Sequence, residues 1–293
     1  MGALDGRVAI ITGAGRGLGR AHALCLAAEG ARVVVNDCGA AVDGGEGDGA
    51  QLAEEVVEAI RGAGGEAVVN TEDVADFDGG RRLIEAALSA FGELHILVNN
   101  AGILRDRALV HLSEDDWDAI MRVHLKGHFV PTRFAAAYWR DRAKRGQRVD
   151  AAVVNTTSTS GLQGNPGQAH YGTAKAGIAA FTLICAQELA RYGVRVNAIS
   201  PGARTRMTDT LPSLARLLRA PLERETFDVW DPANVSPLVA YLASTRCSIT
   251  GQVFKVQGGL VQLYRPWSLG DSVEKTGRWS IEELADVVPK LVE

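Results

Sequence analysis

Two residues of the segment "YGTAK" (171–175) have the types and the spacing for proton transfer. Tyr171 and Lys175 are four positions apart, so they share one face of a helix if the segment is helical. A free tyrosine has a pKa of about 10 and is a poor base at neutral pH, but a nearby ammonium group favours the phenolate and lowers that pKa. The pair therefore predicts a base for a hydroxyl proton. Taken alone, a surface pair without chemistry would be the better interpretation.

Two histidines, His124 and His128, have the same spacing in "VHLKGHF" (123–129). A zinc site would need a third ligand, and no His, Cys or Asp at helical spacing supports one, so we expect no metal. A neutral imidazole offers one hydrogen-bond donor and one acceptor, which suits a proton relay and makes His124 a candidate catalytic residue. For His128 we expect an ordinary role, in packing or at a contact with a neighbouring subunit.

The elements that position these residues begin with a glycine-rich segment, "TGAGRGLG" (12–19), which follows the apolar run 7–11 and opens a helical stretch. Glycines let the backbone approach a diphosphate closely, and a helix N-terminus offers the anion free N–H groups. The next apolar run ends at Asp37, where an acid accepts hydrogen bonds from the adenosine ribose. Its charge opposes the 2′-phosphate of NADP by about 4 kcal/mol at 4 Å, which outweighs attraction by Arg16. We therefore expect NAD; a plain glycine-rich turn capped by Asp37 is the alternative.

The rest of the chain alternates short apolar runs with helical stretches. Strands are expected over 7–11, 31–37, 66–70, 94–100, 150–157, 194–200 and 251–259, and helices over 18–30, 50–65, 76–91, 113–145 and 170–191. Apolar strands joined by helices indicate a parallel sheet covered on both faces, with right-handed crossovers. We expect an α/β fold with a doubly wound parallel sheet in a single domain, 1–263, followed by a C-terminal extension, 264–293. Capping boxes are expected at Ser113 and Ser280, with Asp116 and Glu283 as their partners.

The composition is that of a globular protein, with 46% hydrophobic and 23% charged residues, enough for a substantial core. A net charge of −4 without a basic stripe argues against nucleic acid as a partner. The cysteines (Cys25, Cys38, Cys185 and Cys247) form no metal-ligand spacing and are interpreted as reduced thiols. No apolar run is long enough for a membrane span, and the N-terminus does not resemble a signal peptide. We therefore expect a cytoplasmic protein with no membrane partner.

Four segments in order, "TGAGRGLG", "NNAG" (99–102), Ser158 and "YGTAK", resemble the short-chain dehydrogenase/reductase family. The resemblance covers about residues 6–260. It implies a Rossmann-like fold, hydride transfer between a secondary alcohol and a nicotinamide cofactor, and a homotetramer or dimer. Tyr171 would be the base, with its pKa lowered by Lys175 together with the positive charge of the oxidised nicotinamide. Lys175 would also hold the nicotinamide ribose, and Ser158 would hydrogen-bond the substrate oxygen. The cofactor contacts expected are Gly13, Arg16, Gly17, Leu18, Gly19, Asp37, Asp73, Val74, Asn99, Ala101, Gly102, Tyr171, Lys175, Pro201, Gly202 and Thr205.

His124 departs from this family, most of whose members carry an asparagine there that helps to hold a proton-relaying water. Loss of the asparagine would suit an inactive homologue, but the tyrosine, lysine and serine all remain. "NDCGA…GGEGDG", "VHLKGHF", "GNPGQAHYGTAKAG" and "SPGARTRMT" resemble more narrowly the (3R)-hydroxyacyl-CoA dehydrogenase part of multifunctional enzyme type 2 and its bacterial stand-alone relatives. That branch also has "VHL" at this place, which favours histidine as a replacement for asparagine. The loop 38–49 is expected to be a mobile surface turn, with a lid edge near the adenosine as the alternative.

Residues 203–230 occupy the place of the family's substrate lid. Arginines there would attract the phosphates of coenzyme A, and leucines would cover an acyl chain or a sterol; a solvated amphipathic helix is the alternative. These residues are Arg204, Arg206, Arg216, Arg219 and Arg224, with Leu211, Leu214, Leu217 and Leu218. In such families the extension often closes the substrate pocket or crosses to another subunit, and Trp267 and Trp279 could pack there.

The substrate expected from these features is a small molecule with a secondary alcohol, a 3-hydroxyacyl-CoA of lipid metabolism. A hydroxysteroid dehydrogenase and a 3-oxoacyl reductase are the alternatives with the same mechanism. The alternative of another class is an NAD-binding sensor or scaffold without turnover, for which His124 is the one supporting feature.

Overall fold

A computed structural model describes residues 2–45, 49–205, 220–221, 226–265 and 267–292. Its sheet has the strand order β3-β2-β1-β4-β5-β6-β7-β8, and every pair from β3 to β7 is parallel. The strands are β1 (Val8–Thr12), β2 (Arg32–Asn36), β3 (Ala67–Asn70), β4 (Ile96–Asn99), β5 (Ala151–Thr156), β6 (Val194–Gly202), β7 (Val253–Gln257) and β8 (Leu260–Tyr264). The strand order reverses between β1 and β4, where ligands bind in doubly wound sheets. The predicted fold class is confirmed.

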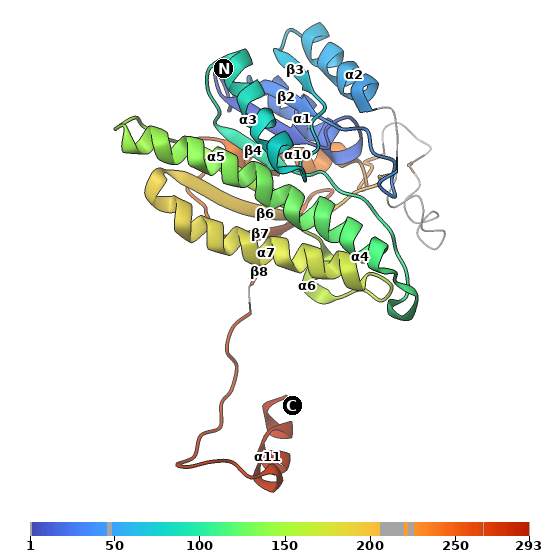
Figure 1. Cartoon of the computed structure of the whole chain (residues 1–293), viewed down its shortest axis with the longest axis vertical. Helices are drawn as coiled ribbons and strands as arrows, with labels where there is room; N and C mark the ends of the chain where they lie inside the picture. Colours follow the sequence, from blue (N-terminus) through green and yellow to red (C-terminus); the bar gives the residue numbers. More distant parts are fainter. Residues whose placement is uncertain (1, 46–48, 206–219, 222–225, 266, 293) are drawn as a thin grey trace. The chain divides into compact units, whose positions relative to one another are not determined.

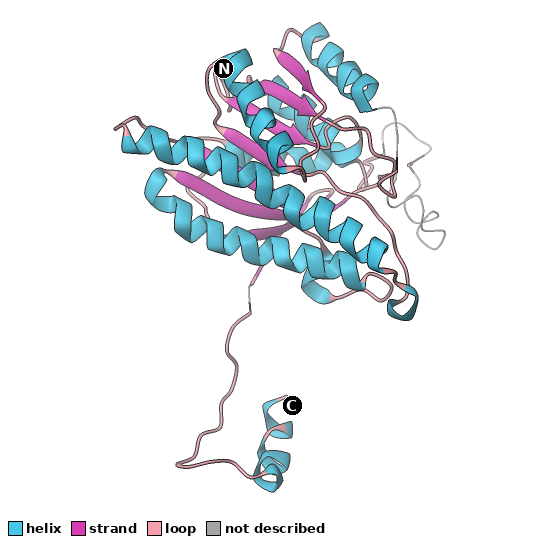
Figure 2. Ribbon diagram, in the orientation of Figure 1, coloured by secondary structure: helices cyan, strands magenta, loops and turns pink. Residues whose placement is uncertain are grey.

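Helices cover both faces of the sheet (Figures 1 and 2). They are α1 (Gly17–Ala28), α2 (Gly49–Gly62), α3 (Phe77–Phe91), α4 (Glu114–Ile120), α5 (Gly127–Lys144), α6 (Thr159–Gln163), α7 (Ala169–Leu189), α10 (Ser236–Ala243) and α11 (Ile281–Val287). Successive strand residues point to opposite faces, so Ile11 packs in the cluster with α1 and α10, and Ile10 in the cluster with α3 and α5. This double burial explains the apolar strands of the sequence.

The helix predicted over 113–145 is not continuous. Between α4 and α5 lies a π-helical segment, η2 (Met121–Lys126), which carries His124. Such segments are rare and frequently occur at functional sites. Pro131, one turn further on, has no backbone N–H to donate, so the regular ladder is interrupted in this part of the chain. Simple helical spacing therefore does not place His124 and His128 in the same environment.

The two predicted capping boxes differ in outcome. The Ser113 side chain accepts a hydrogen bond from the Asp116 backbone at 3.1 Å, but the Asp116 carboxylate pairs with Arg107 at 3.0 Å. The Ser280 and Glu283 box is complete. Because Asp116 has a cationic partner, only half of the first box forms.

Several short elements were not predicted: α6, α10 and β8. The chain divides into two compact units, Met1–Leu263 and Tyr264–Glu293. Within the second unit, the Lys275 ammonium pairs with Glu283 and lies 5.1 Å from the centre of the Trp279 ring, whereas Trp267 is 76% exposed. In the described part of the chain, no helix has the length and apolarity needed to cross a membrane.

Candidate active site

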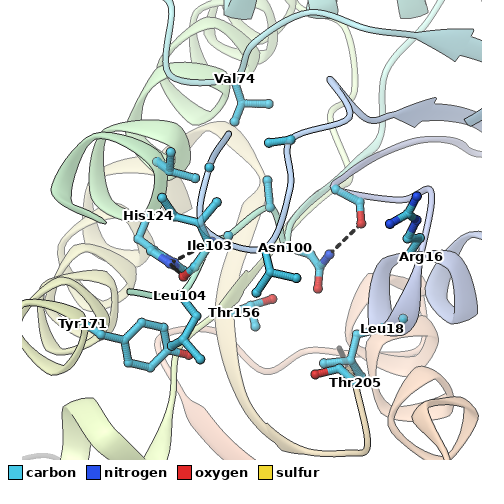
Figure 3. A pocket seen from close by; sticks show the side chains of 18 of the residues that line it. Arg16, Leu18, Val74, Asn100, Ile103, Leu104, His124, Thr156, Tyr171 and Thr205 are labelled. Atoms are coloured by element: carbon cyan, nitrogen blue, oxygen red, sulfur yellow. Dashed lines mark hydrogen bonds between the residues drawn. The ribbon is translucent and has the colours of Figure 1, made fainter. Parts of the chain in front are cut away.

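A cavity of about 810 Å³ lies at the carboxyl ends of β1, β2, β4, β5 and β6, and Figure 3 shows part of its lining. It brings together residues that are more than 150 positions apart in the sequence. The predicted site residues that line it are Gly13, Arg16, Gly17, Leu18, Asp37, Asp73, Val74, Ala101, Gly102, His124, Ser158, Tyr171, Lys175, Pro201 and Thr205. Gly19, Asn99 and Gly202 are not among the lining residues.

The glycine loop has the steric character needed to bind a diphosphate. Gly13 and Gly17 have φ values of 62° and 51°, a backbone region that residues other than glycine rarely adopt. A Cβ on Gly15 would lie 2.9 Å from the Asp37 carboxylate. The N-cap residue of α1, Arg16, makes no side-chain capping hydrogen bond, so the helix N-terminus offers N–H groups and the positive end of its dipole to an anion. These features fit a dinucleotide.

The Asp37 carboxylate is fixed in the cavity wall by two backbone groups. The Gly15 N–H donates to one oxygen at 2.9 Å, and the Gly39 N–H donates to the other at 2.8 Å. The carboxylate therefore bridges the glycine loop and the turn after β2. This position, at the end of β2, is the one expected for an acid that recognises a ribose.

Three residues predicted to contact the cofactor do not line the cavity, and their surroundings are given by other parts of the chain. Asn99 is fully buried, and its amide donates at 2.9 Å to the side chains of Thr132 and Asn155. A Cβ on Gly19 would lie 2.1 Å from the Gly13 carbonyl oxygen, and one on Gly202 would lie 2.8 Å from the Gln257 side chain. These residues permit close packing beneath the cavity, which a motif position alone does not distinguish from contact with a ligand.

Asn100, a lining residue that the sequence reasoning missed, supports the glycine loop from the next strand. Its side-chain amide donates to the carbonyl oxygens of Thr12 at 3.0 Å and Gly13 at 3.1 Å, and Figure 3 shows it in the cavity wall. The "NNAG" motif therefore contributes Asn100, Ala101 and Gly102 to the cavity, and Asn99 to the core.

Tyr171 and Lys175 lie together at the other end of the cavity. The Lys175 ammonium donates to the Thr156 carbonyl at 2.7 Å and lies 5.6 Å from the centre of the Tyr171 ring. Burial lowers the pKa of Lys175 to about 7. Burial also raises the pKa of Tyr171 to about 12, although a hydrogen bond with Ser158 opposes this. In the protein without a cofactor, desolvation is therefore the largest cause of the Tyr171 shift, and the expectation of a lowered pKa with the oxidised cofactor bound stays a prediction.

Ser158 begins α6 as its N-cap residue and accepts a hydrogen bond from the Ser160 backbone at 3.2 Å. Both serines line the cavity, but it is Ser158 that hydrogen-bonds Tyr171. The short helix α6, absent from the predicted elements, is what orients this serine.

His124 lies against the edge of the Tyr171 ring, with the ring centres 5.1 Å apart and the planes perpendicular. Its Nε2 is 2.7 Å from the Ile103 carbonyl oxygen and 3.2 Å from the Ile103 nitrogen (Figure 3). Its Nδ1 is buried without a partner among the described residues. Burial and the nearby Lys175 hold the pKa of His124 well below its usual value, so the imidazole is neutral. Gly102 makes room for it, since a Cβ there would lie 2.4 Å from the imidazole.

His128 is buried beneath the site, with 1% exposure. Its Nε2 lies 3.4 Å from the Thr156 nitrogen, and burial lowers its pKa to about 3. Packing was the correct alternative for His128, and a contact with a neighbouring subunit was wrong. Among the described residues, no group of three or more His, Cys, Asp or Glu side chains could hold a metal ion.

The start of α7 carries further polar residues that the sequence reasoning did not single out. Gln168 lines the cavity, and its amide donates to the Asp106 carboxylate at 2.7 Å. His170, fully buried, places its Nε2 at 2.9 Å from the Arg105 carbonyl oxygen. Their signal was the polar run "NPGQAH" directly before Tyr171, but nothing in that run indicates its partners 62 to 65 positions earlier.

The predicted lid falls largely outside the described residues. Arg204 is described, and its guanidinium pairs with the Asp228 carboxylate at 2.5 Å, so its charge already has a partner within the chain. The other residues assigned to that lid lie outside the described part: Arg206, Arg216, Arg219, Arg224, Leu211, Leu214, Leu217 and Leu218.

Comparisons with known proteins agree with this geometry. The model of the family described as short chain dehydrogenase matches residues 7–214. The chain is 46% identical over 266 residues to the hydroxyacyl-CoA dehydrogenase ChsB1 of Mycobacterium tuberculosis, covering 90% of this chain and 81% of that protein. It is 41% identical over 273 residues to mouse peroxisomal multifunctional enzyme type 2, covering 92% of this chain but 34% of that protein. A crystal structure of a short chain dehydrogenase from Mycobacterium avium has a TM-score of 0.88 at 49% identity, covering 99% of this chain and 96% of that one.

Proposed function

This chain belongs to the short chain dehydrogenase family, and we propose that it oxidises 3-hydroxyacyl-CoA thioesters with NAD. Its family membership makes it an oxidoreductase that acts on CH–OH groups with a nicotinamide cofactor. The observation that carries the proposal is the placement of Ser158, Tyr171 and Lys175 at one end of a cavity whose other end holds the glycine loop and Asp37. A cavity of about 810 Å³ with this lining has room for a dinucleotide site and a proton-transfer site side by side.

The roles of the three residues follow from their contacts. Ser158 hydrogen-bonds the Tyr171 hydroxyl and is placed to donate to the substrate oxygen. Tyr171 takes the alcohol proton in oxidation and returns it in reduction. Lys175 supplies positive charge beneath the ring at 5.6 Å, which favours the phenolate that forms during the reaction.

The cofactor would be held by the glycine loop, Asp37, Asp73, Val74 and the strand ends that line the cavity. When bound, the oxidised nicotinamide accepts the hydride. Asp37 favours NAD because its charge opposes a 2′-phosphate, and its oxygens are already fixed by Gly15 and Gly39. Arg16 also lines the cavity, but a charge on the preformed Asp37 is the stronger determinant.

His124 takes the place of the family's asparagine in the proton relay. Its Nε2 is engaged by Ile103, which leaves the unpartnered Nδ1 to hydrogen-bond a water between it and Lys175. A neutral imidazole suits this role because its Nδ1 accepts a hydrogen bond from the water when Nε2 carries the proton and donates to Ile103.

The substrate class rests on the relatives. The ChsB1 protein is named a hydroxyacyl-CoA dehydrogenase. The match to the multifunctional enzyme spans about a third of that protein's length, so activities of its other parts are not carried over. We place the dehydrogenase in residues 1–263 with the extension 264–293 attached, and we propose a homo-oligomer, a tetramer or a dimer, in the cytoplasm.

The test is a panel of racemic 3-hydroxyacyl-CoA thioesters and hydroxysteroids, each with NAD and with NADP, followed by formation of the reduced cofactor at 340 nm. We expect the rate of thioester oxidation with NAD to exceed the rate of hydroxysteroid oxidation and the rate of thioester oxidation with NADP. Faster reduction of 3-oxoacyl substrates with NADPH would favour the reductase alternative. Binding of NADH without turnover across the panel would make the chain a sensor and overturn the proposal.

A further inference from the structure

Residues 103–106, directly after the "NNAG" motif, connect the two ends of the cavity. The Leu104 N–H donates to the Val42 carbonyl at 2.8 Å, and the Arg105 guanidinium donates to the Asp43 carbonyl at 2.6 Å. Both acceptors belong to the turn 41–45, which follows β2 and Asp37. The 103–106 segment therefore holds that turn through two hydrogen bonds to its backbone.

The turn 41–45 forms part of the cavity wall. Ala41, Val42, Gly44 and Gly45 line the cavity. Two backbone hydrogen bonds close the turn on itself, from Gly44 to Ala41 at 3.0 Å and from Ala41 to Gly45 at 2.9 Å. The turn is thus a preformed unit, and the contacts with the 103–106 segment decide where it sits. For residues 41–45, these contacts favour the alternative of a lid edge near the adenosine over a mobile surface turn.

The same segment anchors the catalytic end. Ile103 holds the His124 Nε2, the Arg105 carbonyl lies 2.9 Å from the His170 Nε2, and the Asp106 carboxylate accepts from Gln168. These anchors flank Tyr171, yet none of them uses the Arg105 side chain. The guanidinium donates to the turn through its Nε and contacts the Asp115 carbonyl and the Asp116 carboxylate through another nitrogen, so it can be changed without removing the catalytic anchors.

Arg107 provides a natural comparison. Arg105 and Arg107 both pair with Asp116, at 3.7 Å and 3.0 Å. Among the described residues, the Arg107 guanidinium has Asp116 as its partner and makes no hydrogen bond to the turn, and its side chain is 58% exposed, against 27% for Arg105. Substitution of either arginine thus removes a positive charge next to Asp116, but only substitution of Arg105 also removes the hydrogen bond to Asp43 in the turn.

We propose that Arg105 is a positioning residue for the dinucleotide, holding the 41–45 turn in place as a wall of the cofactor site before the cofactor binds. The inference rests on the proposed function only in taking the ligand to be a nicotinamide dinucleotide. It predicts that the Arg105 side chain sets cofactor affinity and leaves the chemical step largely unchanged.

The test measures NADH binding by fluorescence in wild type, Arg105→Met, Arg105→Lys and Arg107→Met. We expect Arg105→Met to weaken the Kd about fivefold to tenfold, since it removes a charged hydrogen-bond donor. Arg105→Lys should be intermediate, because lysine keeps one donor without the planar fork. Arg107→Met should stay within about twofold of wild type, being an exposed change. The KM for NAD should follow the Kd, with kcat within about twofold.

Hydrogen exchange of the cofactor-free protein gives a second readout, with faster exchange of the 41–45 amides expected in Arg105→Met. Unchanged NADH affinity in both Arg105 variants, or equal weakening in Arg107→Met, would overturn the inference. Neither readout requires a substrate. The inference about Arg105 can therefore be overturned while the proposed function is supported, and the substrate panel can contradict the proposed function while the inference about Arg105 is supported. If Arg105→Met does not fold, the Arg105→Lys Kd decides.

Discussion

The two ends of the cavity are built by different means. At the dinucleotide end, the chain excludes side chains: a Cβ on Gly13 would lie 2.8 Å from the Ala101 Cα, and N–H groups and one fixed acid provide the recognition. At the catalytic end, the chain buries titratable side chains from η2 and α7, and their pKa values move far from the ordinary ones. The close fit of the backbone is therefore the main feature of the dinucleotide end, and the burial of titratable groups is the main feature of the catalytic end.

The largest effect is expected from removing the hydroxyl at the catalytic end. Tyr171→Phe keeps the ring against His124 but leaves no group to take the alcohol proton, so kcat should fall at least about a thousandfold. NADH affinity should change little, because the dinucleotide end is untouched. Steady-state kinetics and fluorescence titration measure both, with the exposed Tyr241→Phe as a control. Residual activity within tenfold of wild type would contradict the assignment of the base.

The pH dependence tests the same group. Burial raises the pKa of Tyr171 to about 12, so the phenol is protonated at neutral pH and oxidation requires its proton to be lost. The rate of oxidation should therefore rise by up to about tenfold per pH unit from about pH 6 to about pH 9, whereas the rate of reduction, which uses the protonated phenol, should stay nearly constant over that range. Oxidation that is independent of pH, with chemistry shown to be rate-limiting by a substrate deuterium effect, would argue against a tyrosine base.

A smaller effect is expected at His124. His124→Ala should lower kcat about tenfold or more, since a relay step is impaired and a cavity opens beside Tyr171. His124→Asn, which restores the family residue, should recover most of that loss. Thermal melting of both variants separates a folding defect from a catalytic one. Equal losses in the two variants at equal stability would exclude the relay and leave His124 as a packing residue.

At the dinucleotide end, the expected change is in preference rather than rate. Asp37→Ala removes the charge that opposes a 2′-phosphate, so the ratio of kcat/KM for NAD to that for NADP should fall about tenfold. Gly15 and Gly39 then lose their acceptor, which predicts weaker NAD binding as well. Kinetics with both cofactors measure the ratio, and the exposed Asp78→Ala serves as a control. An unchanged ratio would shift the source of selectivity to other lining residues such as Arg16.

The same contrast explains what the sequence could predict. The dinucleotide end is encoded locally, since Gly13 to Asp37 lie within 25 consecutive residues, and the strand-loop-helix pattern predicted both the fold and the glycine loop. The catalytic end depends on contacts between distant segments. Spacing found Tyr171 and Lys175, but not the π-helical turn at His124, the buried place of Asn99, or the bond from Arg105 to Asp43 across 62 positions.

The sign of the Tyr171 pKa shift was also beyond the sequence. A neighbouring ammonium predicts a lower pKa, but the result depends on how much water the fold removes from both groups. In this protein, desolvation is the largest cause for Tyr171 and also for Lys175. The degree of burial follows from the assembled sheet and helices, and spacing along one helix carries no information about it.

The smallest effect concerns stability. Burial lowers the pKa of Lys175 to about 7, so between pH 7 and its ordinary value near 10.4 the unfolded chain binds more protons than the folded one, and this group makes stability rise with pH. Lys175→Met removes the buried amine and its bond to Thr156. At pH 7 it should raise the free energy of unfolding by about 1 to 2 kcal/mol, because the desolvation cost exceeds the lost hydrogen bond, while abolishing turnover.

The pH dependence of that difference is the sharper measurement. Urea unfolding at about pH 7 and about pH 9 should show the advantage of Lys175→Met shrinking as pH rises, since the wild type gains stability over this range and the variant lacks the titrating group. The exposed Lys144→Met should show no such trend. An advantage that is constant with pH would mean that Lys175 is not held with a lowered pKa, and that the catalytic end is less desolvated than its packing indicates.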